Sequence, residues 1–382
     1  MSMRRALLAL IALTGLSGCN PFGWFGDDSS GPKPAELPLL DNALGVRVLW
    51  STSVGSAEQR FIFSPARAAD DVYAAARDGT VVRLDGASGK ARWRVQVERR
   101  LSGGVGTDGN LVVVATDEGE VYALDAQSGK QRWSARVSSE VLAAPAVGEG
   151  LVLVRSGDSR IFALGAEDGK RRWVYQRAAS PLLVRSATGV TMHAGTAYSG
   201  FSGGKLVAIA LSNGGVRWEA TVALPRGATD LERVTDVVGD AVVQGREVCA
   251  AAYQGRVACY EAASGNQLWS REVASLTGVS LDARYAYVSD ERGAVHALDR
   301  TNGRSVWKQD RLAHRRLSVP LPLGSEIAVA DLQGYVHFLA RDSGAFVARI
   351  ATDGSPVRAA PLRLPAGLVV QTHNGGLYAL AR

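Results

Sequence analysis

The sequence has little cysteine, little net charge and no apolar run long enough to cross a membrane. Three cysteines in 382 residues exclude a small disulfide-rich fold and a zinc site built from several cysteines. Lys and Arg number 43 and Asp and Glu number 37, a net charge of +6. This excess is small and scattered, so no nucleic-acid partner is expected. The apolar stretch Ala6–Leu13 is far shorter than the roughly 20 residues of a transmembrane helix.

Glycine, in contrast, is abundant. The chain has 43 glycines against 13 prolines, and 46% of its residues are hydrophobic. The hydrophobic fraction is large enough for a sizeable core, so disorder is not expected. The glycines indicate many tight turns between short strands.

Residues 1–18 have the form of a bacterial lipoprotein signal peptide. Arg4 and Arg5 precede the apolar stretch Ala6–Leu13, and Leu16–Cys19 resembles a lipobox. The resemblance implies cleavage before Cys19, a diacylglycerol on its thiol and acylation of its amino group, which together anchor a protein stably. The alternative is an ordinary secretory signal with a chance cysteine. Asn20, in place of the Asp that marks inner-membrane retention, favours the outer membrane.

Removal of this segment leaves 41 basic and 37 acidic residues, a net charge of +4. Residues 19–45 then form the lipidated cysteine and a flexible tether, because Pro and Gly interrupt the stretch and no hydrophobic period runs through it.

A repeat begins at residue 46. A turn glycine recurs in eight units, with a serine in the third: Gly79, Gly119, Ser159, Gly204, Gly255, Gly293, Gly334 and Gly375. Ten residues later a second glycine recurs: Gly89, Gly129, Gly169, Gly214, Gly265, Gly303 and Gly344. Fourteen residues after the turn, tryptophan recurs at Trp93, Trp133, Trp173, Trp218, Trp269 and Trp307, and Ala348 replaces it in the seventh unit. Such a period indicates a solenoid or a propeller.

One unit shows what each repeat builds. Residues 111–115 are a continuous apolar run, typical of a strand buried on both faces. Residues 121–125 return after the Gly119 turn, and residues 132–135 form a third strand after the next turn. A fourth strand is expected over residues 143–147. Four antiparallel strands in about 40 residues are a propeller blade.

The spacings of the turn glycines, 40, 40, 45, 51, 38, 41 and 41 residues, give eight units. The last unit ends without a tryptophan strand, and the repeat region opens with such a strand, Val46–Trp50, that has no unit before it. We therefore predict an all-β fold, an eight-bladed β-propeller of four-stranded antiparallel blades over residues 46–382. The N-terminal strand completes the last blade and closes the ring, which pairs otherwise open edges.

The stretch Leu124–Trp133, Leu-Asp-Ala-Gln-Ser-Gly-Lys-Gln-Arg-Trp, resembles the tryptophan-docking repeat of quinoprotein-type eight-bladed propellers. Together with the lipobox, the tether and the length, the chain resembles the BamB family, lipoproteins of the outer-membrane β-barrel assembly machinery. The resemblance implies a protein without catalytic activity or cofactor, anchored on the periplasmic face of the outer membrane. It implies binding to the periplasmic POTRA domains of BamA and assistance to folding barrel proteins, and it leaves direct contact with unfolded clients open.

Two connections between units are longer than the others, in residues 180–186 and 227–240. Long loops on a rigid scaffold commonly bind partners. In the first, Leu182, Val184 and Arg185 match a Leu-x-Leu-Arg segment with which the family contacts BamA, Val184 being a conservative departure.

In the second long connection, Asp236 keeps one acid of a paired family motif, whereas Val238 stands where the family often has a second Asp. Apolar anchors beside Arg and Asp suit a binding hot spot with a polar rim. The alternative is structural: Leu182 and Val184 in a strand core, and Asp236 capping a turn.

Several motifs have a structural explanation. Residues 200–204 match the G-x-S-x-G nucleophile elbow, but they fall on a predicted hairpin turn where the elbow needs a strand-to-helix turn. Residues 104–109 match G-x-G-x-x-G, but a strand follows where a phosphate site needs a helix. His296 and His337 lie three residues after their repeat glycine, where other units carry aromatic residues. They are expected to pack within blades, and no metal site is predicted.

Two other functions share the fold. A quinoprotein-type dehydrogenase would hold a quinone at the propeller axis, but such enzymes carry a calcium site, a base and usually vicinal cysteines in a longer chain. A periplasmic propeller that binds cell-wall glycan is the other. Calcium-dependent quinone binding would identify the first, and retention on peptidoglycan sacculi the second.

Cys249 and Cys259 lie equally far from Gln254, the centre of a predicted hairpin. A three-residue loop 253–255, with Gly255 in the left-handed conformation, would place the cysteines directly opposite each other. An exported protein reaches an oxidising compartment, which favours a disulfide. The alternative is a pair of small buried residues, since other units carry alanine at the position of Cys259.

Overall fold

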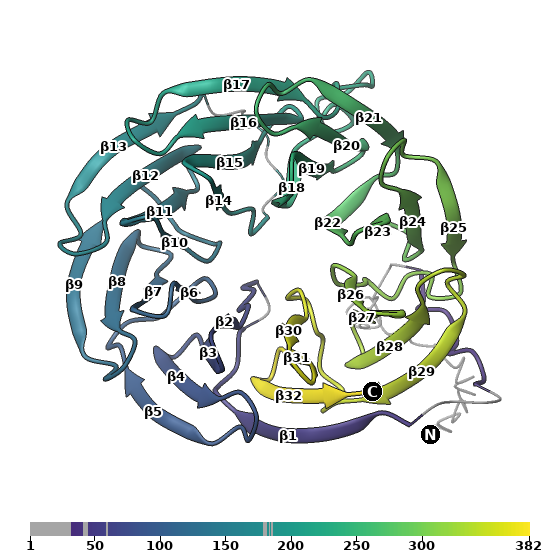
Figure 1. Cartoon of the computed structure of the whole chain (residues 1–382), viewed down its shortest axis with the longest axis horizontal. Helices are drawn as coiled ribbons and strands as arrows, with labels where there is room; N and C mark the ends of the chain where they lie inside the picture. Colours follow the sequence, from purple (N-terminus) through teal and green to yellow (C-terminus); the bar gives the residue numbers. More distant parts are fainter. Residues whose placement is uncertain (1–31, 41–44, 59, 179–181, 183, 185) are drawn as a thin grey trace, which may run out of the picture. The chain divides into compact units, whose positions relative to one another are not determined.

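A computed structural model describes residues 32–40, 45–58, 60–178, 182, 184 and 186–382. The chain divides into two compact units, Met1–Lys33 and Pro34–Arg382; the fold below is that of the second. Its described residues form eight four-stranded antiparallel sheets arranged as the blades of a ring (Figure 1). The predicted eight-bladed β-propeller is confirmed. No helix among the described residues is long and apolar enough to span a membrane.

Each blade runs from an inner strand beside the ring axis to an outer strand at the rim (Figure 1). The first four blades are β2 (Ala66–Ala68), β3 (Asp71–Ala75), β4 (Thr80–Asp85) and β5 (Ala91–Gln96); β6 (Gly106–Thr107), β7 (Leu111–Ala115), β8 (Glu120–Asp125) and β9 (Gln131–Arg136); β10 (Ala146–Gly148), β11 (Leu151–Ser156), β12 (Arg160–Gly165) and β13 (Arg171–Gln176); and β14 (Thr191–His193), β15 (Thr196–Phe201), β16 (Lys205–Ala210) and β17 (Val216–Thr221).

The other four blades repeat this order, and the eighth takes its outer strand from the N-terminal part of the chain. They are β18 (Val237–Gln244), β19 (Glu247–Ala252), β20 (Arg256–Glu261) and β21 (Gln267–Glu272); β22 (Ser275–Leu281), β23 (Tyr285–Asp290), β24 (Val295–Asp299) and β25 (Ser305–Gln309); β26 (Leu321–Leu323), β27 (Glu326–Ala330), β28 (Tyr335–Ala340) and β29 (Phe346–Ala351); and β30 (Leu362–Leu364), β31 (Gly367–Gln371), β32 (Gly376–Ala381) and β1 (Arg47–Ser53).

The second strand of each blade lies in the core, as the apolar runs predict. All five residues of β7 are buried, because β7 is flanked by strands on both sides and by neighbouring blades on both faces. The inner strand of the next blade is shorter than expected. β10 begins at Ala146, after Pro145, because proline has no N–H to donate to a sheet.

The ring closes where the N-terminal and C-terminal strands meet. β1 pairs antiparallel with β32, from Arg47 opposite Ala381 to Ser53 opposite Gly376. This is the closure that the unmatched N-terminal tryptophan strand predicts. It gives β32 a neighbour on both sides, so the strand at the chain's C-terminal end is not an open edge.

Tryptophans join each blade to the next. In every case the indole Nε1–H of an outer strand donates a hydrogen bond of 2.6–2.9 Å to a carbonyl in the turn between the third and outer strands of the following blade. The pairs are Trp50–Gly86, Trp93–Ala126, Trp133–Ala166, Trp173–Leu211, Trp218–Ala262, Trp269–Arg300 and Trp307–Arg341.

The second repeat glycine lies directly against this indole. Gly303 has φ +70°, and a Cβ there would lie 2.5 Å from Cε3 of Trp269. Glycine therefore serves both the left-handed turn and the close approach of the ring. This contact also explains the missing tryptophan at Ala348. The eighth blade has no turn between its third and outer strands, because these are the two ends of the repeat region. An indole at position 348 would have no such turn to contact.

Replacement of Gly303 by alanine tests this clamp. We expect Gly303→Ala to lower the free energy of unfolding by about 1–2 kcal/mol from backbone strain and by about 1–3 kcal/mol more from collision with Trp269. Gly245→Ala is the matched control, because Gly245 has φ +64° with nothing within 4 Å of the added Cβ. In denaturant unfolding, the control should lose only the part of the free energy of unfolding that comes from backbone strain. Equal losses in both variants would contradict a clamp.

Candidate partner-binding face

Strand alternation gathers two kinds of loop at one end of the ring. The hairpin turns between second and third strands lie there, beside the connections that lead from one blade to the next. Backbone hydrogen bonds join the two kinds of loop, for example Leu101 N to Arg77 O at 3.0 Å and Glu291 N to Ala274 O at 3.1 Å. We call this end the loop face. Both long connections belong to it.

The first long connection leaves β13 and reaches β14. Leu182 is 44% exposed, and neither Leu182 nor Val184 lies in a strand, so Leu182 is not part of a strand core. Arg185 lies outside the described residues. The backbone N–H of Val184 donates a 2.6 Å hydrogen bond to Oδ2 of Asp236.

Asp236 therefore links the two long connections. Its side chain is buried, and its other carboxylate oxygen accepts a 3.3 Å bond from the N–H of Gly203, in the turn between β15 and β16. Burial raises the pKa of this carboxyl, while the Val184 and Gly203 amides and then Arg155 oppose the rise. The carboxylate holds loops in place and does not point into solvent.

A cavity of about 240 Å³ lies between these loops and is lined by Arg155, Val184, Thr188, Phe201 and Asp236 among others. The Arg155 guanidinium lies 4.9 Å from the centre of the Phe201 ring and donates a 3.3 Å bond to the carbonyl of Thr188. Enclosure by protein lowers its pKa to about 10, against the opposing effect of Asp240 and Asp236. The cavity thus has a cation on one wall and an aromatic ring behind it.

The second long connection ends in a compact turn. Oε2 of Glu232 accepts bonds from the N–H groups of Ala228 and Thr229, and Oγ1 of Thr229 accepts one from the N–H of Glu232. This reciprocal arrangement is the one found at helix starts, although no helix follows. It holds Leu231 outward, 71% exposed.

Sequence reasoning missed two exposed leucines of the same face. Leu224 is 65% exposed at the start of the second long connection, and Leu276 is 47% exposed at the start of β22. With Leu182 and Leu231 they give four exposed leucines in or directly after the connections that lead into blades 4, 5 and 6. They are candidate apolar anchors for a partner that binds this face. The sequence does hold a signal for these two leucines: each is an apolar residue in or beside a connection, at a position where the repeat requires none.

The motifs set aside on sequence grounds fall where the repeat predicts. Residues 202–204 form the turn between β15 and β16, and no helix follows them. The Nε2 atoms of His296 and His337 lie 2.8 and 3.0 Å from carboxylate oxygens of Asp290 and Asp331 within their blades. In the described part of the chain no group of three His, Cys, Asp or Glu side chains could hold a metal ion.

Comparison with known proteins agrees with this architecture. A family model described as "Outer membrane protein assembly factor BamB" matches residues 77–309. A protein of that name from Bordetella pertussis is 44% identical over 374 residues, which cover 98% of this chain and 96% of the relative. The namesake from Escherichia coli is 33% identical and covers 100% of both chains. The chain belongs to the BamB family.

Solved structures agree with the BamB fold. The crystal structure of BamB from Moraxella catarrhalis superposes with a TM-score of 0.80 at 26% identity, covering 88% of this chain and all of that one. The quinohemoprotein alcohol dehydrogenase of Comamonas testosteroni gives a TM-score of 0.67 at 13% identity, covering 88% of this chain and 76% of that one. A likeness at that identity shows a shared fold alone.

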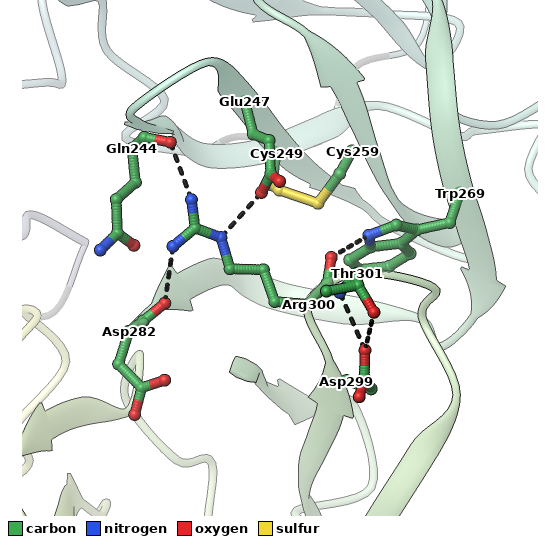
Figure 2. The surroundings of a disulfide bond; sticks show 9 residues. All are labelled: Gln244, Glu247, Cys249, Cys259, Trp269, Asp282, Asp299, Arg300 and Thr301. Carbon is green, nitrogen blue, oxygen red and sulfur yellow. Dashed lines mark hydrogen bonds and ion pairs between the residues drawn. A yellow bond between two sulfur atoms is a disulfide. The ribbon is translucent and has the colours of Figure 1, made fainter. Parts of the chain in front are cut away.

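This BamB-family chain also carries a cysteine pair in its fifth blade. Cys249 on β19 lies directly opposite Cys259 on β20, and their sulfurs are bonded in a disulfide (Figure 2). Both residues are fully buried. The turn differs from expectation: Gln254, with φ +47°, takes the left-handed conformation in place of Gly255. Glycine is needed at 255 for space, because a Cβ there would lie 2.6 Å from the Cβ of Ala223.

Around the disulfide, Arg300 joins blade 5 to blade 6 (Figure 2). Its guanidinium contacts Oε2 of Glu247 at 2.7 Å and the carbonyls of Gln244 and Asp282 at 2.8 and 2.9 Å. Its own carbonyl accepts the indole N–H of Trp269. The covalent link therefore lies inside a region that is already clamped to its neighbour.

Thiol counting tests the disulfide. Because the sulfurs are bonded, we expect the exported Cys19→Ser protein, unfolded without reductant, to show no free thiol and two after reduction. Cys249→Ser in the same background is the control and should show one thiol without reduction. Loss of the link should lower stability by about 1–3 kcal/mol, since it closes a short loop. Two thiols in the unreduced parent would rule out the link.

Proposed function

We propose that the protein is a non-catalytic scaffold lipoprotein of the outer-membrane β-barrel assembly complex. It binds the POTRA region of BamA and assists the folding and insertion of outer-membrane barrel proteins. The observation that carries the proposal is the near full-length match to the BamB family, on a ring whose loop face presents exposed leucines beside the family's binding segments.

The chemistry of the ring supports a scaffold. The cysteines described in the blades face each other across a hairpin and are not adjacent in sequence, unlike the vicinal pair usual in quinoprotein dehydrogenases. The blade turns are short, and the two long connections are held by hydrogen bonds between backbone and Asp236 or Glu232. Such loops offer shape and apolar contact to a partner. Neither a quinone nor a cell-wall glycan is favoured by a particular feature of the loop face.

The proposal places the chain at the periplasmic face of the outer membrane through a lipid on Cys19. The lipobox supports it, as does the name shared by its relatives. Outer strands with mostly exposed residues, such as β9, suit a ring that such an anchor holds in water.

Substitution of the lipidated cysteine tests the anchor. Cys19→Ser should leave an unprocessed precursor without acyl chains, and membrane fractionation of cells should no longer recover it with the outer membrane. Ser17→Ala, which keeps a small residue before the cleavage site, should fractionate normally. Binding to BamA must be prevented in this test, so that the partner does not carry the protein into the membrane fraction. Recovery of the Cys19→Ser protein with the outer membrane under that condition would show that the lipobox is not used.

The partner surface makes a second test. Leu182→Ala combined with Arg185→Glu should weaken capture of the BamA POTRA region by about tenfold or more, since buried apolar and arginine anchors dominate such interfaces. Leu231→Ala should add to the loss. The matched control is Leu268→Ala, an equally exposed leucine, 48%, on the outer strand β21.

All of these variants should melt within a few degrees of the parent, because the replaced leucines are exposed. A large fall in melting temperature for Leu182→Ala would instead indicate a packing role. Asp236→Asn is expected to weaken capture indirectly, by loosening the Val184 loop, with increased protease cleavage of residues 180–186 as the distinguishing readout.

A further inference from the structure

A segment ahead of the propeller lies on the loop face. Residues 34–38, here called the strap, precede β1, within the stretch expected from sequence to be a flexible tether. The N–H of Ala35 donates a 2.9 Å bond to the carbonyl of Ala313, and Arg315 Nη1 donates a 2.8 Å bond to the carbonyl of Ala35. Arg349 Nη1 donates a 3.2 Å bond to the carbonyl of Pro38, which is itself buried. The strap is therefore held at both ends.

The site that receives the strap is part of the core of blade 7. Arg315 is 2% exposed, and its Nε contacts Asp331 Oδ2 at 2.6 Å while Nη2 contacts Gln333 Oε1 at 2.5 Å. The same Oδ2 of Asp331 lies 3.0 Å from Nε2 of His337. Among the described residues the strap carbonyl is the hydrogen-bond partner of Nη1. A buried guanidinium needs its donors satisfied, so the strap completes the arginine's bonding.

The loop beneath the strap has two residues with an unusual backbone conformation. Its two residues on either side of Arg315, His314 and Arg316, have φ of +59° and +48°. Positive φ is unfavourable for side chains of this kind, and such strain persists only where surrounding contacts impose it. In this loop the two positive φ angles turn the Arg315 side chain inward and leave the Ala313 carbonyl available to the strap. Arg315 and Arg349 also lie 5.8 and 5.7 Å from the centre of the Tyr335 ring.

Ala313 and Arg315 belong to the connection between β25 and β26, and Asp331 and Gln333 to the turn between β27 and β28. Both are loops of the loop face. Because Lys33 is bonded to Pro34, the chain that leads back to Cys19 starts from this face. A stretch of the length of residues 20–33 can span at most about 50 Å. Without the strap, the free chain would extend to β1 at Arg47 and be nearly twice as long.

We propose that the strap fixes the lipid-bearing end of the chain to the loop face, so that this face is turned toward the lipid surface of the membrane. The inference rests on lipidation of Cys19 in the function proposed above. It goes beyond that function because it assigns a role to residues 34–38 and says which face of the ring is turned toward the membrane. The long connections that carry Leu182 and Leu231 would then be presented on the membrane side.

The first experiment measures docking of the strap and does not need the lipid. Hydrogen exchange of the exported Cys19→Ser protein should show the Ala35 amide protected by roughly tenfold or more relative to an unstructured chain. Pro34→Gly with Pro38→Gly loosens the backbone at both ends of the strap and removes the buried ring, and it should abolish this protection while the Ala35 amide is still present to be measured. Leu39→Ala is the control, because Leu39 is 88% exposed, and it should exchange like the parent. The melting temperature of the ring should fall by only a few degrees, because water can replace the strap carbonyl at Arg315 Nη1 once the strap is released.

The second experiment measures which face of the ring lies closer to the membrane. The lipidated chain is reconstituted into vesicles of phosphatidylethanolamine and phosphatidylglycerol that contain a headgroup nitroxide. A fluorophore is attached at Asp310→Cys on the loop face or at Ser212→Cys in a turn on the opposite face, both exposed positions. Quenching should be severalfold greater at position 310 than at position 212, and the strap double variant should remove most of the difference.

Each outcome decides a separate part of the proposal. Unprotected exchange at Ala35 in the parent overturns the strap. Equal quenching at positions 310 and 212, or a difference that survives the double variant, overturns its role in directing the loop face. Failure of the parent to float with the vesicles contradicts lipidation of Cys19, and with it both the proposed anchor and the membrane direction, whereas the exchange result still decides whether the strap is docked.

Discussion

The contact between an outer-strand indole and the turn of the next blade is the constraint on which the ring depends. Apart from blades 7 and 8, each blade is held to the next by one indole ring, one hydrogen bond and one glycine that leaves room for the ring. Aromatic side chains bury large areas and fix geometry through their polar atom. Because the contact recurs seven times among the described residues, small deviations in one blade do not spread, and loops elsewhere are free to diverge.

The one junction without this contact lies between blades 7 and 8, where Ala348 takes the tryptophan position. There the two blades are held by apolar packing, in which Val46 and Ile350 contact the buried residues of blades 7 and 8. The strap lies next to this junction, through Arg349 of β29. The chain's N-terminal segment thus adds bonds to blade 7 and to the connection that leads into it, and blade 7 is the blade whose outer strand lacks a tryptophan.

The blades could be predicted from sequence because their signal is local and periodic. Glycine and tryptophan are required at fixed distances from each turn, so eight units, their strands and the closing role of β1 follow from spacing. The binding face could not be predicted to the same depth. Asp236 contacts amides at Val184 and Gly203, far away in sequence, and no pattern reveals a carboxylate that bonds backbone. Likewise Ala223, in the connection between blades 4 and 5, occupies the space beside Gly255, and Gln254 takes the left-handed conformation that the sequence assigns to Gly255.

These distant contacts form a continuous support for the candidate binding loops. The disulfide joins β19 to β20, and the turn of that hairpin donates a 2.9 Å bond from Tyr253 N to the carbonyl of Asp236. The carboxylate of Asp236 in turn holds the N–H of Val184, two residues from Leu182. A covalently braced hairpin therefore positions the backbone from which the first long connection is held. Shape that is set before a partner arrives lowers the entropic cost of binding, and the bond to Asp236 sets the backbone at Val184 in this way.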